Sequence, residues 1–351
     1  MSLKTRSICL ICSILSLFLL FFQFSFSQSD FSQVDALVKK NQKILGNDVV
    51  ALVYKDGKVV HSQELGEFNA KTPAPIASCS KWLTAALVMM FVDEGKLDLD
   101  DPVSKYLPVF DKYMKSYVTI RQCLTHTTGI ENDKGNLLKM VQRSKFTSLE
   151  EEVNTFAAKE ISNNAGTEFH YGGIGLNVAG RVLEVITKKP FDRLIQEKLL
   201  RPLKMKQTSF MNENGYAPNP SGGARSTAND YINFLSMILS KGMFEGKKIL
   251  SEKAIEEMEK PQFTNLPVKY TPKVAEGFHY GLGEWIQEED ANGNSTVVSS
   301  PGLFGTWPYI DKCRNYAAII FVKSLLNEQK KDIAMQFKSA VDEVVGGSNC
   351  K

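Results

Sequence analysis

The order of predicted elements along the chain indicates an α/β fold, in which strands from both chain ends form one sheet and an all-helical lobe is inserted between them. Two hairpin signals support the sheet, Asp56-Gly57 near the N-terminus and Asn292-Gly293 near the C-terminus, each between strand-like runs. Between about residues 100 and 262, helical patterns are instead separated by loops that contain Pro and Gly. We therefore expect a sheet flanked by helices, with a helical insertion.

The individual elements follow from local patterns. Residues 31–44 have the apolar spacing of an amphipathic helix. Residues 78–94 form a run that is apolar on nearly all sides and ends at Gly95, so we expect a central, buried helix with a glycine cap. The other expected elements are helices at 147–161, 173–187 and 227–242, strands in the second hairpin and in FGTWPYID and YAAIIFV, and a final helix at about 326–345.

The first 27 residues differ from the rest of the chain. Lys4 and Arg6 precede an apolar stretch, and small residues stand before Gln28, as in a secretory signal peptide. The alternative is an uncleaved membrane anchor, because the apolar stretch is slightly long for a signal peptide. The expected domain then consists of an α/β lobe and a helical lobe, with bounds at 28–100 and 265–351 for the first and at 101–264 for the second.

The overall composition is that of a globular protein with little net charge. The chain has 351 residues, 43% of them hydrophobic and 23% charged, and a formal net charge of +3. Removal of Lys4 and Arg6 with the leader would leave +3 − 2 = +1. We therefore expect no nucleic-acid partner. No comparable apolar run follows the leader, so we expect no membrane span in a cleaved chain.

Four cysteines follow the leader. Cys79 and Cys123 lie in apolar helical patterns, where a buried thiol is expected. Cys313 and Cys350 are the better candidates for a disulfide, which export would permit. The alternative for this pair is two free thiols.

The run IASCSKWLTAAL, residues 76–87, contains a candidate nucleophile. Ser78 and Lys81 are three residues apart and share one face of a helix, whereas Ser80 is not on that face. A lysine held in dry surroundings has a lowered pKa and can take the proton of a serine hydroxyl. Because S-x-x-K alone is a weak signal, the alternative is that Ser78 caps the helix and Lys81 lies on the surface.

Longer segments resemble the serine β-lactamase and penicillin-binding-protein superfamily, and within it the class C-like branch of esterases and peptidases. The resemblance covers about residues 45 to 345, in order. It implies a β-lactamase/transpeptidase-like fold with an antiparallel sheet, and acylation of a serine by an ester or amide without a metal or organic cofactor. The matching segments are IASCSKWLTAALVMMFVDEGKLDLDDPVSKYLPVF, YVTIRQCLTHTTGI, GTEFHYGGIGLNVAGRVLEVITKKPFDRLIQEKLLRPLKM, GGARSTANDYINFLSMIL and SSPGLFGTWPYID.

The resemblance implies a role for each matching position. Ser78 matches the nucleophile, Lys81 its base, and Tyr171 the tyrosine of a Y-x-N motif that moves the proton between serine and leaving group. Leu303, after the third motif, would join Ser78 in donating backbone N–H groups to an oxyanion hole. The expected substrate-binding positions are Gly173, Ser300, Gly302 and Trp307, of which Trp307 is expected to form a wall of the acyl pocket.

Other residues near these motifs are given structural roles. We interpret Tyr309 as a core residue. His126, in LTHTTG, is interpreted as a packing residue near the junction of the lobes.

Two positions depart from the family pattern. Gly173 replaces the asparagine of Y-x-N, which removes an amide contact, and Ser300 replaces the lysine of K-T-G, which removes a cation that would bind a substrate carboxylate. Arg225 is the one nearby candidate for a replacement cation. These departures favour an esterase over an amidase, peptidase or efficient β-lactamase.

The leading hypothesis is therefore an exported serine hydrolase, periplasmic or secreted, that acts on a small-molecule ester, amide or peptide. The alternative is a non-catalytic member of the same fold that binds a ligand or partner. The presence of Ser78, Lys81 and Tyr171 together favours the hydrolase, because a protein free of catalytic demand has no reason to hold all three.

Overall fold

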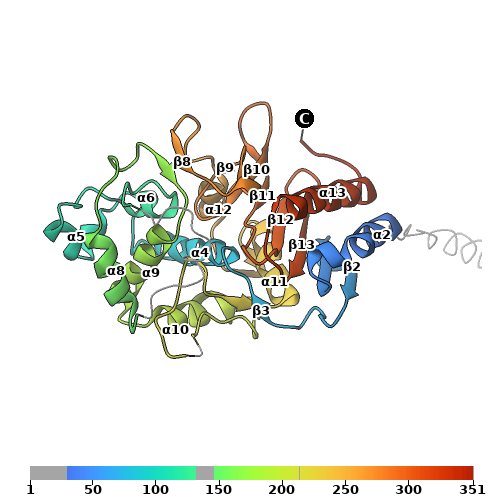
Figure 1. Ribbon diagram of the computed structural model, residues 1–351, viewed down its shortest axis with the longest axis horizontal. Helices are drawn as coiled ribbons and strands as arrows, with labels where there is room; N and C mark the ends of the chain where they lie inside the picture. The colour runs from blue at the N-terminus through green and yellow to red at the C-terminus, as the bar shows by residue number, and fades with distance from the viewer. Residues whose placement is uncertain (1–29, 132–145, 213, 351) are drawn as a thin grey trace, which may run out of the picture.

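The computed structural model describes residues 30–131, 146–212 and 214–350. Its centre is a seven-stranded antiparallel sheet with the strand order β2-β1-β13-β12-β11-β10-β9. The two chain ends thus contribute neighbouring strands, as predicted (Figure 1). The strands are β1 (Val49–Lys55), β2 (Lys58–Leu65), β9 (His279–Tyr280), β10 (Trp285–Glu289), β11 (Ser295–Ser299), β12 (Trp307–Asp311) and β13 (Tyr316–Val322).

The two predicted hairpins are confirmed. Asp56 and Gly57 connect β1 to β2 with φ values of 50° and 81°, the left-handed backbone that a tight two-residue turn requires. Gly293, with φ of 79°, lies in the turn between β10 and β11. The strand β13 is buried along its whole length because it lies between β1 and β12.

Helices cover both faces of the sheet. One face packs against α2 (Ser32–Lys40), α3 (Gln42–Leu45) and the C-terminal α13 (Glu328–Val345). The opposite face shares its core with α4 (Cys79–Asp93) and α11 (Ala228–Leu239). The predicted central helix is confirmed as α4, which is buried on nearly all sides and is followed by Gly95 with φ of 66°.

The helical lobe lies beside the sheet, and α4 separates the two (Figure 1). α4 contacts α9 (Ile174–Thr187) on the lobe side and α12 (Glu252–Glu259), and α11 contacts β1, β12 and β13. Thus α11, which falls within the predicted lobe 101–264, packs on the sheet. The lobe helices are α5 (Val109–Lys112), α6 (Ile120–Leu124), α8 (Leu149–Ala158), α9 (Ile174–Thr187) and α10 (Phe191–Ile195), which continues into a π-helical turn, η2 (Gln196–Leu200).

Short strands and turns join these layers. Further two-stranded pairs lie outside the main sheet; two of them join segments that are far apart in sequence, and the third is a local hairpin. They are β3 (Ala74–Pro75) with β5 (Arg225–Ser226), β4 (Phe169–His170) with β8 (Val268–Tyr270), and β6 (Met243–Phe244) with β7 (Lys247–Lys248); single turns are η1 (Val103–Lys105) and η3 (Lys273–Ala275).

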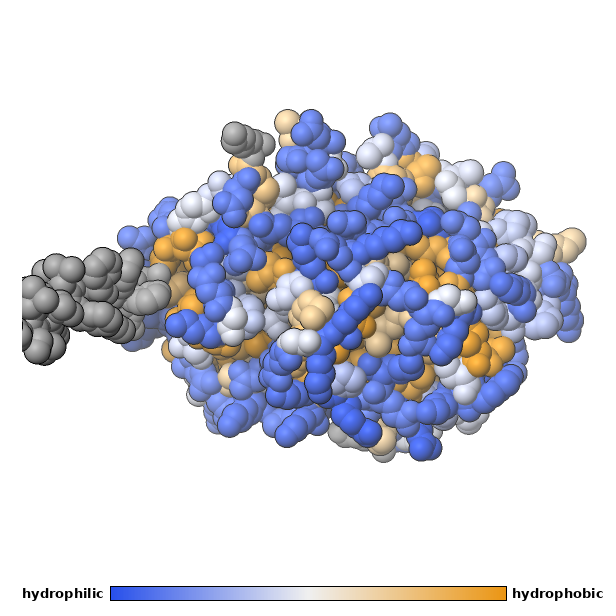
Figure 2. Space-filling view, turned by 180° about the vertical axis from the view of Figure 1, so that it is seen from behind, coloured by the Kyte–Doolittle hydropathy of each residue, from blue (hydrophilic) through white to orange (hydrophobic). Residues whose placement is uncertain are grey.

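The surface seen in Figure 2 is mostly hydrophilic, with separate apolar areas. Within residues 30–131, 146–212 and 214–350, no helix combines the length and hydrophobicity needed to cross a membrane. The leader expected at residues 1–27 lies outside the described residues. Cys313 and Cys350 form a disulfide, while Cys79 and Cys123 are buried free thiols.

Candidate active site

The start of α4 brings Ser78 and Lys81 together. Ser78 lies immediately before the helix, Lys81 lies in its first turn, and the Lys81 Nζ is 3.1 Å from the Ser78 Oγ. Ser80 points elsewhere, since its hydroxyl donates to the Ala77 carbonyl at 2.6 Å and accepts from the Ala224 N–H at 3.0 Å. In the structure, Ser78 and Lys81 therefore share one face of the helix, as their spacing predicts, and Ser80 does not.

The Lys81 amine occupies dry surroundings. The residue is 2% exposed, its Nζ donates to the Ser221 carbonyl at 2.7 Å, and it forms no ion pair with any described residue. Burial lowers the pKa of Lys81 to about 7. Because a free lysine has a pKa near 10.4, this shift makes a neutral amine available at ordinary pH.

Tyr171 is packed against the same amine. The Lys81 Nζ lies 4.9 Å from the centre of the Tyr171 ring, which also contacts the rings of His126 and Trp285. Burial raises the pKa of the Tyr171 phenol above its usual range, and hydrogen bonds from the Ser78 hydroxyl and the Trp285 indole oppose the rise only in part. The phenol is therefore held in its protonated form.

His126 supports this arrangement from behind. Its Nε2 is 3.0 Å from the Tyr280 hydroxyl, and its ring centre is 4.6 Å from that of Tyr171. Burial, followed by the charge of Lys81, lowers the pKa of His126 well below its usual value. The neutral imidazole packs at the lobe junction and is not among the residues that line the pocket.

The segment after β11 crosses the start of α4. The Ser300 hydroxyl donates to the Ser78 carbonyl at 3.4 Å. A Cβ at Gly302 would lie 2.2 Å from the Ile76 carbonyl, so the close approach of these two segments requires glycine there. In the described part of the chain, the backbone N–H groups of Ser78 and Leu303 have no hydrogen-bond acceptor. Both residues line the same pocket, so two backbone donors are left free there.

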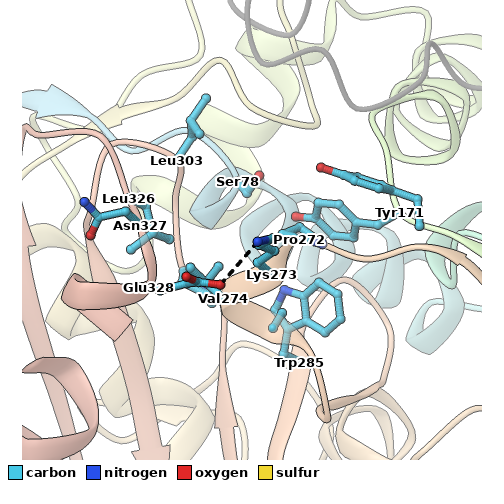
Figure 3. Close-up of a pocket in the computed structure, with 13 residues that line it drawn as sticks. Ser78, Tyr171, Pro272, Lys273, Val274, Trp285, Leu303, Leu326, Asn327 and Glu328 are labelled. Atoms are coloured by element: carbon cyan, nitrogen blue, oxygen red, sulfur yellow. Dashed lines mark ion pairs between the residues drawn. The ribbon is translucent and has the colours of Figure 1, made fainter. Parts of the chain in front are cut away.

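Ser78, Tyr171 and Leu303 line a pocket of about 320 Å³. The hydroxyl ends of Ser78 and Tyr171 face each other in Figure 3, and Trp285 lies below Tyr171. Most of the wall is apolar, and it is formed by segments from the sheet, α4, the lobe and the N-terminus of α13. The lining residues are Ser78, Tyr171, Tyr270, Pro272, Lys273, Val274, Ala275, Trp285, Pro301, Leu303, Leu326, Asn327 and Glu328.

Trp307 does not form the pocket wall that the sequence predicted. It is buried in the cluster between the sheet and α13, together with Tyr309, and its indole donates to Gln287 at 3.4 Å. Residues two apart on a strand share a face, so Trp307 and Tyr309 must point to the same side. The tryptophan that lines the pocket is Trp285, from β10.

Gly173 and Arg225 also lie away from the pocket lining. Gly173 precedes α9, and a Cβ there would lie 2.9 Å from the Ser221 Oγ, so the loop that carries Ser221 fills the adjacent space. Arg225 lies in β5 and donates to the Pro73 carbonyl at 3.4 Å. Arg225 is absent from the pocket lining, so it does not replace the lysine that the third motif lacks. The lining contains a different basic residue, Lys273.

Sequence reasoning missed three polar residues at the site. The Ser221 carbonyl holds the Lys81 amine, and Lys273 of η3 forms an ion pair of 3.7 Å with Glu328 at the start of α13 (Figure 3). Ser221 lies in the turn-rich stretch NPSGG, which gives no sign of a catalytic contact. Lys273 and Glu328 belong to no motif.

A family model for beta-lactamase matches residues 34–339. The chain belongs to the beta-lactamase family. The structure of a putative beta-lactamase from Bacteroides dorei DSM 17855 is similar, with a TM-score of 0.80 and 30% identity over 90% of this chain and 99% of that one. The beta-lactamase/transpeptidase-like fold expected from the sequence is therefore confirmed.

More distant relatives share the same fold. An octameric penicillin-binding protein homologue from Pyrococcus abyssi superposes with a TM-score of 0.73 at 22% identity, covering 91% of this chain and 78% of that one. Among curated proteins, Protein flp of Staphylococcus aureus (strain MW2) is 26% identical over 278 residues, or 74% of this chain. The chain spans about half the length of that curated relative, 54%.

Proposed function

We propose that this member of the beta-lactamase family is a serine hydrolase that cleaves esters through a covalent acyl-enzyme on Ser78. The observation that carries the proposal is the 3.1 Å contact between the Lys81 amine and the Ser78 hydroxyl, with the pKa of Lys81 lowered by burial to about 7. An adjacent base of suitable pKa converts a weak hydroxyl into a nucleophile.

In the acylation step, the neutral Lys81 amine takes the Ser78 proton while the Oγ bonds to the substrate carbonyl carbon. The N–H groups of Ser78 and Leu303 stabilise the developing oxyanion, and each such donor is typically worth roughly 2.7–4 kcal/mol. Tyr171 donates its proton to the leaving group, and the proton on Lys81 restores the phenol. Water then attacks the acyl carbon while the neutral Lys81 amine takes one of its protons, and that proton passes to the Ser78 Oγ as its bond to the acyl carbon breaks and the acid is released.

Esters are favoured because the segment that follows β11 has no cation to hold a β-lactam carboxylate. The hydroxyl of Ser300 offers a neutral donor and already contacts the Ser78 carbonyl. A charge-assisted hydrogen bond is roughly twice as strong as a neutral one. Gly173 supplies no side-chain amide. These departures from the motifs of the class C-like branch favour its esterases over its β-lactamases.

Export is part of the proposal and rests on two separate observations. Residues 1–27 have the composition of a signal peptide. The disulfide between Cys313 and Cys350 is a bond that persists in oxidising compartments and is rare in the cytosol of mesophiles. We therefore place the mature protein in the periplasm or outside the cell.

A fluorophosphonate probe tests the proposed nucleophile. Intact-mass measurement after exposure should show one covalent adduct, and peptide mapping should place it on Ser78. The matched control is Ser78→Ala, which should remain unlabelled. An unlabelled parent protein that is folded would favour the non-catalytic alternative, and an adduct on Ser80 would overturn the assignment of the nucleophile.

A further inference from the structure

The pocket in front of Ser78 contains one pair of charged side chains. Of the thirteen described residues in its lining, Lys273 and Glu328 are the two with acidic or basic side chains that form an ion pair. Lys273 comes from η3, and Glu328 is the first residue of α13. Figure 3 shows their charged ends directed at each other, with apolar groups on either side. A substrate that fills the pocket therefore meets a cation that no catalytic motif supplies.

Lys81 is not available to a substrate carboxylate. The Lys81 amine is buried behind Ser78, is held by the Ser221 carbonyl, and does not belong to the pocket lining. Ser300, at the position where relatives carry a lysine, is neutral. Lys273 is consequently the one positive group among the described lining residues that a substrate anion can reach.

The ion pair between Lys273 and Glu328 can be exchanged for a pair between Lys273 and a substrate carboxylate. The two charged atoms are 3.7 Å apart, and the side chains are 76% and 66% exposed. Exposed pairs of this kind contribute little, because water solvates the separated charges well. In the described part of the chain, the Lys273 ammonium has no hydrogen-bond acceptor. A substrate carboxylate can take the place of Glu328 without leaving a buried charge unpaired.

Glu328 does not depend on Lys273 for its position. It occupies the first turn of an 18-residue helix, where an acidic side chain is favoured by the partial positive charge of the helix N-terminus. Asn327 caps the same helix by accepting from the Lys330 N–H at 3.0 Å. The carboxylate of Glu328 can thus leave Lys273 and still be stabilised.

From these contacts we infer that Lys273 is the specificity-determining residue for an acyl group with an apolar body and a terminal carboxylate, which replaces Glu328 as the partner of the Lys273 ammonium. This inference rests on the proposed esterase function and adds its substrate class. The apolar lining accommodates the body of such an acyl group, and the cation lies at a different place from the lysine of the family's third motif.

Matched 4-nitrophenyl esters test the inference. The octanoate and the monoester of suberate have equally long acyl chains that end in a methyl group and a carboxylate; hexanoate and adipate form a shorter pair, and 8-aminooctanoate presents an ammonium. The quantity measured is the ratio of kcat/KM for the carboxylate ester to kcat/KM for the methyl ester. The parent should prefer the carboxylate ester over the ammonium ester, and added salt should reduce that preference.

Single substitutions then assign the preference. Lys273→Met should lower the ratio roughly tenfold, mainly through KM, and Glu328→Gln should raise it about threefold, because it removes the competing carboxylate. The control is Lys331→Met, which should leave the ratio unchanged. Lys331 lies on α13 like Glu328, but its side chain packs over Phe278 and is outside the pocket lining.

Two results overturn the inference. One is a ratio that stays within twofold of the parent in Lys273→Met at both chain lengths, and the other is a parent that prefers the ammonium ester. Either result, with octanoate hydrolysed and Ser78 labelled, refutes the substrate class and leaves the esterase standing. If octanoate is not hydrolysed and Ser78 is not labelled, the proposed function itself fails.

Discussion

The site contains two lysines, Lys81 behind the pocket and Lys273 in its lining, and they differ in almost every physical respect. Lys81 is 2% exposed and is held by the Ser78 hydroxyl and the Ser221 carbonyl, whereas the side chain of Lys273 is 76% exposed and has one distant ion-pair partner. Burial lowers the pKa of Lys81 to about 7 and makes it a base. Lys273 instead lines the pocket, where a substrate anion can reach its side chain. The same residue type thus serves proton transfer on one side and recognition on the other.

Substitutions among the buried catalytic residues should lower activity far more than substitutions of the exposed Lys273 and Glu328. Ser78→Ala removes the nucleophile, and loss of the nucleophile in a serine hydrolase reduces turnover roughly 10⁶-fold. Ser80→Ala, two residues away, should lower hydrolysis of 4-nitrophenyl butyrate much less, because Ser80 bonds only to backbone groups. Circular dichroism checks that both variants fold. A dead Ser80→Ala beside an active Ser78→Ala would reverse the assigned face of α4.

The next largest effect is expected at Tyr171, on the same buried side. Tyr171→Phe keeps the ring contacts with His126 and Trp285 and removes only the hydroxyl. Loss of one positioned proton-transfer group typically costs roughly 10²–10⁴-fold in rate. Steady-state kcat with 4-nitrophenyl butyrate measures the loss. A rate within about threefold of the parent would remove Tyr171 from the mechanism we propose.

A smaller effect on activity is expected when a lysine is introduced at Ser300, next to the buried catalytic groups. The parent should turn over nitrocefin at least about a hundredfold less efficiently than 4-nitrophenyl butyrate, because Ser300 and Gly173 lack the carboxylate contacts of the family pattern. Ser300→Lys restores the cation and should raise nitrocefin acylation about tenfold. Stopped-flow measurement of acylation separates this step from hydrolysis. A parent that prefers nitrocefin would contradict our interpretation of the third motif.

The smallest effect on activity is expected far from both sides of the pocket. Cys313→Ser breaks the disulfide that ties the C-terminal tail to the end of the hairpin between β12 and β13. The bond closes a loop with a sequence separation of 37 residues, and removal of such a bond typically costs on the order of 2–4 kcal/mol of stability. Denaturant unfolding should show this loss, while kcat with 4-nitrophenyl butyrate stays within about twofold. Equal stability of oxidised parent and variant would contradict it.

Local periodicity explains which parts of the site could be predicted. Ser78 and Lys81 share a helix face because they are three residues apart, and the hairpins follow from turn residues such as Asp56-Gly57. Trp307 was misplaced although the period of a strand already requires it to share a face with Tyr309. Which face borders the pocket depends on packing against α13, and no local pattern contains that information.

The exposed side of the pocket could not be predicted for a related reason. Lys273 and Glu328 are 55 residues apart and meet only because η3 and the start of α13 pack at the same end of the sheet. Each residue is individually an ordinary surface charge. The Ser221 carbonyl is a backbone group, so its contact with Lys81 leaves no side-chain signature in the sequence.

The pH dependence of kcat/KM for 4-nitrophenyl butyrate tests the central claim, that the buried Lys81 is the base, most directly. Below the lowered pKa of about 7 the amine is protonated and cannot accept the Ser78 proton; above it the amine is neutral. We therefore expect kcat/KM of the parent to rise with pH through a single ionisation near 7. A folded protein whose kcat/KM stays flat or falls between about pH 5.5 and 9 would contradict it.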